Sequence, residues 1–533
     1  MKKIATLLAA TALASLTAAT GAWSKTLVYC SEAAPEGFDV TLYQGGNTFD
    51  ASSRTVMNRL VEFKHGSTEL EPGLAESYTI SPDGLVYTFK LRPGVKFQTT
   101  DYFTPTRDLN ADDVVFSFER QLKADSPWAK YVEGATYAYA GDMGMPDLIK
   151  SVEKVDDLTV KFTLNKPEAP FLADLGMDFA SIFSKEYADK LVAENNLIQL
   201  NQKPIGTGPY TFVDYQQDAV IRFKANPDYW GGKQKIDDLV FAITTDAAVR
   251  AQKLKAGECH IMPYPNAADV AELKKDPNLT VLEGPGLNVS YLAYNTKIAP
   301  FDKVEVRKAL NMAVNKQAIV DAVFQGAAQV AKNPIPPTMW SYNKDTVDDA
   351  YDPEAAKKAL DAAGVKDLKM KIWAMPVSRP YMLNAKRAAE LMQADLAKVG
   401  VTVEIVSYEW AEYLKNSKDP KRDGAVILGW TGDNGDPDNF LDPLLGCGAA
   451  ENGGNRAFWC NDEFEKLKNA AKQTSDMAER TKLYEQAQLV FKKEAPWMTI
   501  DHSVAFTPIS KKVTGFFQEP LGYHRFDGVD IAE

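Results

Sequence analysis

Between residues 352 and 406 the sequence alternates helix and strand, and this alternation limits the fold more than any other feature of the chain. Asp352 and Pro353 are suited to the N-cap and first position of a helix. Leu368–Trp373 is typical of a strand, Asn384–Val399 of an amphipathic helix, and Val401–Val406 of a second strand. Because strands separated by helices usually pair in parallel, this region is predicted to form a largely parallel sheet covered by helices.

A hairpin followed by a capped helix is predicted between residues 70 and 120. Glu76–Ile80 and Leu85–Leu91 are expected strands, joined by the turn residues Ser81-Pro-Asp-Gly84. Asn110 can cap a helix whose first turn contains Asp113. This pattern by itself indicates an α+β region and no particular function.

The first 24 residues have the composition of an export signal. Lys2 and Lys3 precede a mostly apolar or small stretch, Ile4–Ala22, and Ala22-Trp23-Ser24 offers small residues for cleavage. A lone membrane anchor is the alternative, but the stretch is short and rich in Ala and Thr. We therefore expect an exported protein cleaved near Ser24, long enough for two or three domains.

The net charge and the cysteines argue against two kinds of function, nucleic-acid binding and metal binding. The formal net charge of −12 argues against nucleic-acid binding, which needs a basic surface. The four cysteines are Cys30, Cys259, Cys447 and Cys460. In an exported chain they are predicted to form two disulfides, for which the sequence permits three pairings. The chain contains no CxxC motif, so we expect no metal site.

The densest acidic cluster is Asp433-Asn-Gly-Asp-Pro-Asp438, which follows Trp430. A calcium loop is one interpretation, although the EF-hand pattern fails because Cys447 stands where glutamate is required. A glycosidase-type carboxylate pair is a second interpretation. Solvated or capping acids in a turn are a third. The fourth is a buried carboxylate that meets an ammonium group, with Trp430 as an apolar wall.

Arg379 lies in a Pro-containing loop after the predicted strand that ends at Trp373. A guanidinium there can grip a carboxylate with two hydrogen bonds, and loops at strand ends of open α/β sheets often bind ligands. A surface arginine is the alternative. The chain contains neither GxSxG nor HExxH, so an enzyme has little positive support.

Long strings across the chain resemble one family, the extracytoplasmic solute-binding proteins that serve peptide and nickel ABC importers. One is the segment of residues 70–120, which contains the hairpin and the capped helix. The others are Cys30–Glu32, Asn58–Phe63, Pro167–Asp174, Met262–Asn266, Pro336–Trp340 and Gly429–Asn439. They cover nearly the whole chain after the signal, and they are far longer than a short motif.

The resemblance implies an α/β, bilobal periplasmic-binding-protein fold, with mixed sheets covered by helices and hinge strands between the lobes. Lobe I is expected to comprise 25–285 and 502–533, with an extra α+β subdomain at about 65–200, and lobe II to comprise 286–501. An apolar strand at Leu287–Asn295 and a long helix, Val304–Phe324, are predicted just after the first crossing. The chain is expected to return near His502–Ile509.

The resemblance also implies a function and a site. Members that bind dipeptides hold the ligand α-ammonium with one aspartate and its α-carboxylate with one arginine, and the matching positions are Asp433 and Arg379. The other expected ligand-binding residues are Trp430, Thr431, Gly432 and, in a turn of the first lobe, Gly46, Asn47 and Thr48. The implied disulfides are Cys30–Cys259 and Cys447–Cys460.

A receptor of this kind is expected to act as a monomer without a cofactor, and to pass dipeptides to the membrane permease of an ABC importer. A chemoreceptor is a further possible partner. Two alternatives stay open at this point. One is a receptor of the same fold for haem, tripeptides or another small solute. The other is an exported hydrolase that uses the acidic cluster.

Overall fold

A computed structural model describes residues 24–452 and 454–532. The predicted signal peptide, apart from Ser24, lies outside the described residues. Within those two ranges, no helix combines the length and the apolar character of a transmembrane span.

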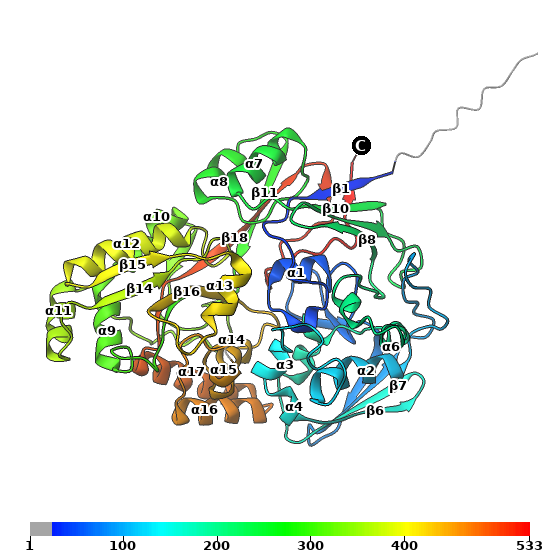
Figure 1. The fold of residues 1–533 in the computed structure, drawn as a ribbon, viewed down its shortest axis with the longest axis horizontal. Helices are drawn as coiled ribbons and strands as arrows, with labels where there is room; N and C mark the ends of the chain where they lie inside the picture. Colours follow the sequence, from blue (N-terminus) through cyan, green and yellow to red (C-terminus); the bar gives the residue numbers. More distant parts are fainter. Residues whose placement is uncertain (1–23, 453, 533) are drawn as a thin grey trace, which may run out of the picture.

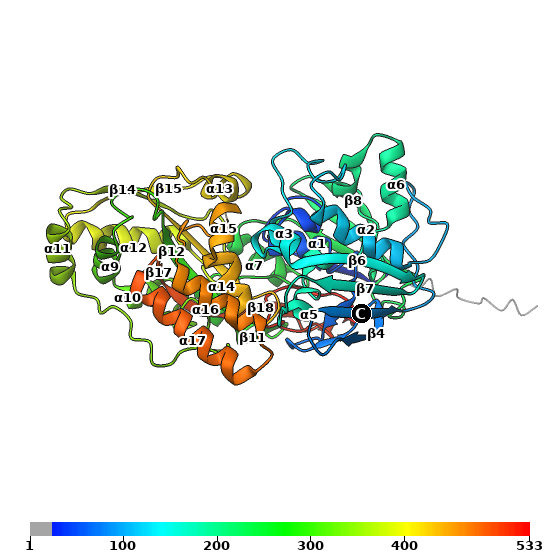
Figure 2. The same cartoon turned by 90° about the horizontal axis from the view of Figure 1, so that it is seen from below.

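The molecule has two halves, each with its own hydrophobic core (Figures 1 and 2). We call them lobe I and lobe II. The core of lobe I includes Leu27, Phe89, Phe162 and Tyr210, and the core of lobe II includes Val289, Ile372 and Val426. Trp430 packs against both cores, so the boundary between the lobes runs past this side chain.

Lobe II is built on a five-stranded sheet in the order β15-β14-β16-β12-β17. The strands are β12 (Asn288–Tyr294), β14 (Lys369–Trp373), β15 (Thr402–Val406), β16 (Ala425–Thr431) and β17 (Trp497–Thr499). β14 pairs in parallel with β15 and β16, whereas β12 runs antiparallel to β16 and β17. The predicted parallel arrangement therefore holds for three strands, and the complete sheet is mixed.

Helices pack around this sheet and form the rest of lobe II. They are α9 (Val304–Ala313), α10 (Lys316–Phe324), α11 (Pro353–Ala362), α12 (Ala385–Lys398), α13 (Trp410–Ser417), α14 (Asp438–Leu445), α15 (Cys447–Asn452), α16 (Asp462–Gln473) and α17 (Met477–Glu494). Every residue of β12 is buried, as expected for a strand covered on both faces.

The predicted long helix over 304–324 is wrong: the segment forms two helices, α9 and α10. Val314 has an extended backbone and ends α9. Asn315 then caps α10, because its side chain accepts a 3.0 Å hydrogen bond from the backbone N–H of Ala318. A polar cap inside an apolar periodic pattern marks this break.

Lobe I contains two four-stranded sheets, β1-β10-β9-β8 and the antiparallel β4-β5-β7-β6. Their strands are β1 (Thr26–Tyr29), β4 (Ala75–Ile80), β5 (Val86–Leu91), β6 (Ile149–Asp156), β7 (Thr159–Leu164), β8 (Tyr210–Gln216), β9 (Val220–Ala225) and β10 (Asp238–Ala242). Smaller pieces are β2 (Val61–Phe63) with β3 (Leu70–Pro72), and β19 (Val513–Thr514) with β20 (Asp530–Ile531).

The helices of this part of the chain are α1 (Gly46–Ala51), α2 (Ala111–Leu122), α3 (Ala138–Asp142), α4 (Met145–Leu148), α5 (Phe171–Asp174), α6 (Lys185–Ala193), α7 (Ala247–Ala256) and α8 (Ala267–Leu273). The predicted hairpin is β4–β5, and α2 carries the predicted cap as a full capping box between Asn110 and Asp113. These elements form the extra α+β part of lobe I.

Two long strands connect the halves. β11 (Leu279–Pro285) and β18 (Asp501–Ser510) pair antiparallel over seven residues, and β13 (Ala328–Val330) joins the far part of β18. β11 leads directly into β12, and β18 follows β17, so both connections cross between lobes side by side (Figure 1). The exact lobe boundaries at 285/286 and 501/502 stay a prediction.

Both implied disulfides are present, Cys30–Cys259 and Cys447–Cys460. The first joins the residue after β1 to the segment after α7. The second joins two cysteines that are 13 residues apart in the sequence, and the loop that it closes contains α15. Closing such loops stabilises the fold mainly by restricting the unfolded chain.

Candidate ligand-binding site

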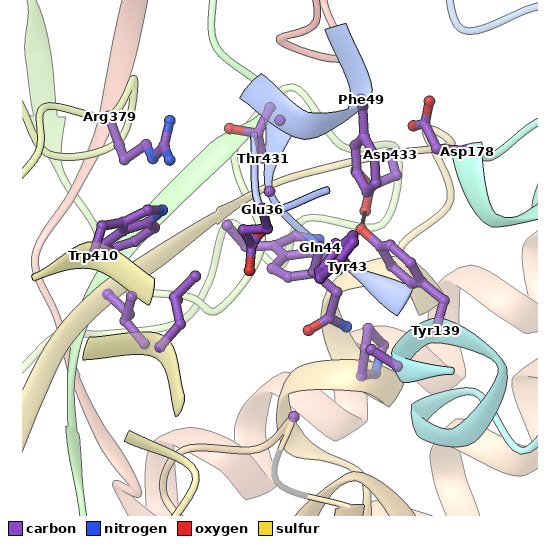
Figure 3. Close-up of a pocket in the computed structure, with 18 of the residues that line it drawn as sticks. Glu36, Tyr43, Gln44, Phe49, Tyr139, Asp178, Arg379, Trp410, Thr431 and Asp433 are labelled. Atoms are coloured by element: carbon purple, nitrogen blue, oxygen red, sulfur yellow. Dashed lines mark hydrogen bonds between the residues drawn. The ribbon is translucent and has the colours of Figure 1, made fainter. Parts of the chain in front are cut away.

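A cavity of about 550 Å³ lies between the two lobes. Lobe I contributes the loop before α1 and the segment that leads into α3. Lobe II contributes the loop after β14, helix α13, the end of β16 and the residues around the second disulfide. Figure 3 shows Arg379 and Trp410 on one side of this cavity and Asp433 with Tyr139 on the other.

Arg379 is held rigidly in the loop between β14 and α12. Its backbone N–H and C=O both bond to Met382, at 3.1 and 3.0 Å. Its guanidinium donates to Glu32 at 2.6 Å and to Asn47 at 3.0 Å, both in lobe I, and lies 4.8 Å from the centre of the Trp410 ring. The arginine is only 5% exposed, so the surface interpretation of this residue is wrong.

Asp433 directly follows β16, on the opposite side of the cavity. Its Oδ2 accepts a 2.8 Å hydrogen bond from the hydroxyl of Tyr139 and a 3.3 Å bond from the Asn439 amide. Burial, together with the nearby Asp178 carboxylate, raises the pKa of Asp433 to about 7. An incoming cation would favour the ionised form of this carboxylate.

Three residues before Asp433 have different surroundings. Trp430 and Thr431 are half-buried and line the cavity. Trp430 donates its indole N–H to Asn439 at 3.0 Å, whereas Oγ1 of Thr431 is buried without a hydrogen-bond partner. Gly432 is buried in the wall, where a Cβ atom would come within 2.7 Å of the Phe440 ring. Its role is close packing behind the cavity.

The predicted turn at residues 45–48 is the start of helix α1. The carbonyl of Gly45 accepts hydrogen bonds from the backbone N–H groups of Thr48 and Phe49, at 2.9 and 3.1 Å, so the helix begins at Gly46. Gly46 lines the cavity. Asn47 lies behind the wall, where its Oδ1 accepts the bond from Arg379.

Thr48 also lies behind the wall, where its Oγ1 accepts from the backbone N–H of Glu36 at 3.0 Å. Neither Asn47 nor Thr48 forms part of the lining, so within the described chain they support residues that do.

The remaining acids of the 433–438 cluster make structural ion pairs. Asp436 accepts two hydrogen bonds from Arg480, at 3.0 and 2.8 Å, and caps the backbone N–H of Asp438. Asp438 lies 3.4 Å from the ammonium of Lys472. Neither carboxylate lines the cavity. Among the described residues no group of acidic, histidine or cysteine side chains is arranged to hold a metal ion.

Several lining residues were not predicted from sequence. Tyr139, Trp410, Glu36 and Lys418 all face the cavity. Trp410 opens helix α13, and its indole N–H is buried without a hydrogen-bond partner. In a sequence, an aromatic residue at the start of a helix looks the same whether it contacts a ligand or packs in the core.

Comparison with known proteins decides the family. Residues 69–452 match the family described as bacterial extracellular solute-binding proteins, family 5. The chain belongs to this family. Solved structures similar to this chain include a dipeptide-binding protein from Pseudoalteromonas sp. SM9913 in complex with Met-Leu, with a TM-score of 0.92 and 39% identity over 95% of this chain and 100% of that one. The fold is accordingly the bilobal binding-protein fold with mixed α/β sheets.

Two characterised relatives of this family 5 protein are similar over nearly their full length. The dipeptide-binding protein of Escherichia coli (strain K12) is 54% identical over 532 residues, covering 100% of this chain and 99% of that protein. Heme-binding protein A of Haemophilus influenzae is 52% identical over 509 residues, covering 95% and 92%. The relatives are binding proteins, and they are named for two different ligand classes.

Proposed function

We propose that this chain is the substrate-binding receptor of an ABC importer and that it binds dipeptides between its lobes. One observation carries the proposal: a buried arginine and a half-buried aspartate stand on opposite sides of a single cavity (Figure 3). A dipeptide is a zwitterion whose charged ends lie apart, at about 3.3–3.6 Å per extended residue. Fixed counter-charges at both ends select such a molecule by its length.

Arg379 keeps donors for the ligand carboxylate. A guanidinium has five N–H donors, and in this structure Glu32 and Asn47 each accept one hydrogen bond from it. The remaining N–H groups are available to a carboxylate, and Glu32 and Asn47 fix the direction in which they point. A charge-assisted bond of this kind contributes about 1.5–3 kcal/mol.

Asp433 is the counterpart for the ligand α-ammonium. Tyr139 and Asn439 occupy Oδ2, whereas Oδ1 accepts no hydrogen bond from any described residue. An ammonium bound there pairs with the carboxylate and shifts its ionisation toward the charged form. A longer peptide in the same pose would leave one of its charged ends without its partner, which is costly away from water.

The cavity volume of about 550 Å³ falls within the range of small-molecule sites, about 300–1,000 Å³. The E. coli relative is named for dipeptides, and the Pseudoalteromonas structure contains Met-Leu. The Haemophilus relative is named for haem, so haem is the second candidate ligand. The pair of opposed charges favours the dipeptide.

The remaining parts of the proposal follow from the family. We infer an exported, periplasmic receptor with its signal cut near Ser24, acting as a monomer and delivering its ligand to a membrane permease, with a chemoreceptor as a further partner. A hydrolytic role is less well supported, because Asp436 and Asp438 are engaged in ion pairs outside the cavity.

Titration calorimetry on protein unfolded and refolded to remove co-purified ligand tests this proposal. The ligands are Ala-Ala, N-acetyl-Ala-Ala, Ala-Ala-amide, Ala-Ala-Ala and haemin. We expect micromolar or tighter binding of Ala-Ala, and a loss of about tenfold or more for either blocked end, equivalent to at least 1.4 kcal/mol. Undiminished binding of both blocked peptides would overturn the site. Binding of haemin alone would favour the haem receptor.

A further inference from the structure

The cavity contains a second pair of opposite charges, Glu36 and Lys418. Glu36 precedes α1 in lobe I, and Lys418 is the residue that ends α13 in lobe II. Figure 3 shows Glu36 between the Arg379 side and the Asp433 side of the cavity. Glu36 is therefore positioned beside the middle of a ligand whose ends are held at those two sides, and Lys418 lines the same cavity.

Neither charge forms an ion pair in the part of the chain that the structure describes, and the Glu36 carboxylate is hydrogen-bonded only to the Thr48 hydroxyl. Oε1 of Glu36 is buried and makes no hydrogen bond. The side chain of Lys418 makes no ion pair and no hydrogen bond, and its separation from Glu36 exceeds the 4.0 Å of a direct ion pair. Because both side chains line the cavity, a polar group of the ligand can reach them.

The electrostatics of the two groups agree with this geometry. Burial raises the pKa of Glu36, and Lys418 is the charge that opposes this shift most. Burial also lowers the pKa of Lys418 to about 8, assisted by the neighbouring Arg456 guanidinium and opposed by Asp142 and Glu36. Each group is thus partly desolvated. The two charges interact electrostatically although they form no direct ion pair.

We propose that Glu36 and Lys418 form a side-chain subsite that recognises a ligand side chain carrying both a hydrogen-bond donor and an acceptor, a primary carboxamide being the simplest. This inference rests on the proposed dipeptide function. The amide NH₂ donates to Glu36, and the amide oxygen accepts from Lys418. The carboxamide adds no net charge to a neutral pair.

Charged side chains fit this subsite less well than a carboxamide. A carboxylate gains from Lys418 but is repelled by Glu36, and an ammonium gains from Glu36 but is repelled by Lys418. An apolar side chain leaves both charges without partners. The nearby Gln44 directs one of its amide N–H groups to Asp142, at 3.1 Å.

Calorimetry with matched dipeptides tests the subsite. Gln, Met, Glu and Lys are placed in turn at each position of an otherwise Ala dipeptide. We expect one of the two Gln dipeptides to bind about tenfold more tightly than its Met counterpart in the unmodified protein. In Lys418→Met and in Glu36→Leu this Gln-to-Met ratio should fall close to one.

Lys421→Met is the matched control, because Lys421 is exposed, lies three residues farther along and does not line the cavity. It should leave the ratio unchanged. A ratio near one in the unmodified protein, or a ratio that survives Lys418→Met and Glu36→Leu, would overturn the subsite while leaving dipeptide binding intact. Failure of every dipeptide to bind would instead overturn the proposed function and the subsite with it.

Discussion

The hydroxyl of Tyr139 in lobe I donates a 2.8 Å hydrogen bond to Oδ2 of Asp433 in lobe II. Packing holds the Tyr139 ring in place, because the residue is 1% exposed, stacks on Phe179 and meets the Trp430 ring edge to face. The bond favours the ionised form of a carboxylate that burial otherwise pushes toward protonation. It also joins the two lobes at the point where the ligand ammonium is proposed to bind.

Replacing Tyr139 with phenylalanine should weaken dipeptide binding. The loss of this donor removes support from the Asp433 carboxylate and raises its pKa further, so a smaller fraction is ionised at pH 7. We expect a loss of about 10–150-fold in affinity, corresponding to about 1.5–3 kcal/mol for one hydrogen bond to a charged group. Titration calorimetry measures it.

Tyr137→Phe is the control for this change. Tyr137 is two residues earlier, and its hydroxyl donates to the Trp128 carbonyl at 2.9 Å, away from Asp433. This variant should bind dipeptides like the unmodified protein. Equal affinities for Tyr139→Phe and Tyr137→Phe would contradict the role given to Tyr139.

Dipeptide affinity should fall as the pH drops below about 7. The pKa of Asp433 is raised to about 7 in the ligand-free protein, so acidification protonates the group that pairs with the ligand ammonium. The dissociation constant should then rise by up to about tenfold per pH unit, until the lower pKa of Asp433 in the complex is reached. Above about pH 8 the ligand α-amino group loses its own proton and binding weakens again.

Calorimetry between pH 5 and 9 follows this profile. Asp433→Asn supplies the comparison, because its amide does not titrate. This variant should bind weakly and lose the slope below pH 7, while the weakening above pH 8 persists. If dipeptide affinity fell equally steeply below pH 7 in both proteins, a group other than Asp433 would be responsible for the fall.

Local signals in the sequence account for much of the fold. Asp352 and Pro353 start α11, and the strand predicted at Leu368–Trp373 is observed as β14, because caps and side-chain alternation act over a few residues. Asn315 was missed as a cap because the apolar period continues on both sides of it. The partners of the candidate site leave no local signal. Tyr139 lies 294 residues from Asp433, and Glu32 lies 347 residues from Arg379.

Arg379 has two roles, which a pair of substitutions can separate. Arg379→Met removes the proposed carboxylate contact but also leaves Glu32 buried without its cation. Breaking a buried ion pair in this way costs about 3–5 kcal/mol of folding free energy. We therefore expect Arg379→Met to unfold at lower denaturant concentration and to lose dipeptide affinity.

The double variant Glu32→Gln/Arg379→Met removes both charges. It should recover most of the lost stability, because no buried carboxylate remains unpaired, but it should not recover dipeptide affinity. Urea unfolding and calorimetry measure the two quantities. A double variant that binds dipeptides normally would show that Arg379 serves the fold alone.

Lys472 should be the lysine on α16 whose loss costs the most stability. Its ammonium lies 2.7 Å from Glu168 of lobe I and 2.5 Å from Asp442 of lobe II, and its carbonyl accepts from the backbone N–H of Ala169 at 2.7 Å. It also lies 3.4 Å from Asp438, whose pKa burial raises to about 8.

Lys472→Met leaves these buried carboxylates without their shared cation, so the free energy of unfolding should fall by about 3–5 kcal/mol in urea titration at pH 7.5. Part of the loss should return as the pH falls, because Glu168 and Asp442 lose the cation that lowers their pKa, and a proton taken up by either relieves the repulsion between the carboxylates left behind. Lys466→Met, at an exposed position of the same helix, should stay within about 0.5 kcal/mol of the unmodified protein. If Lys472→Met behaved like Lys466→Met, the contact between Glu168 and α16 would contribute nothing to holding the lobes together.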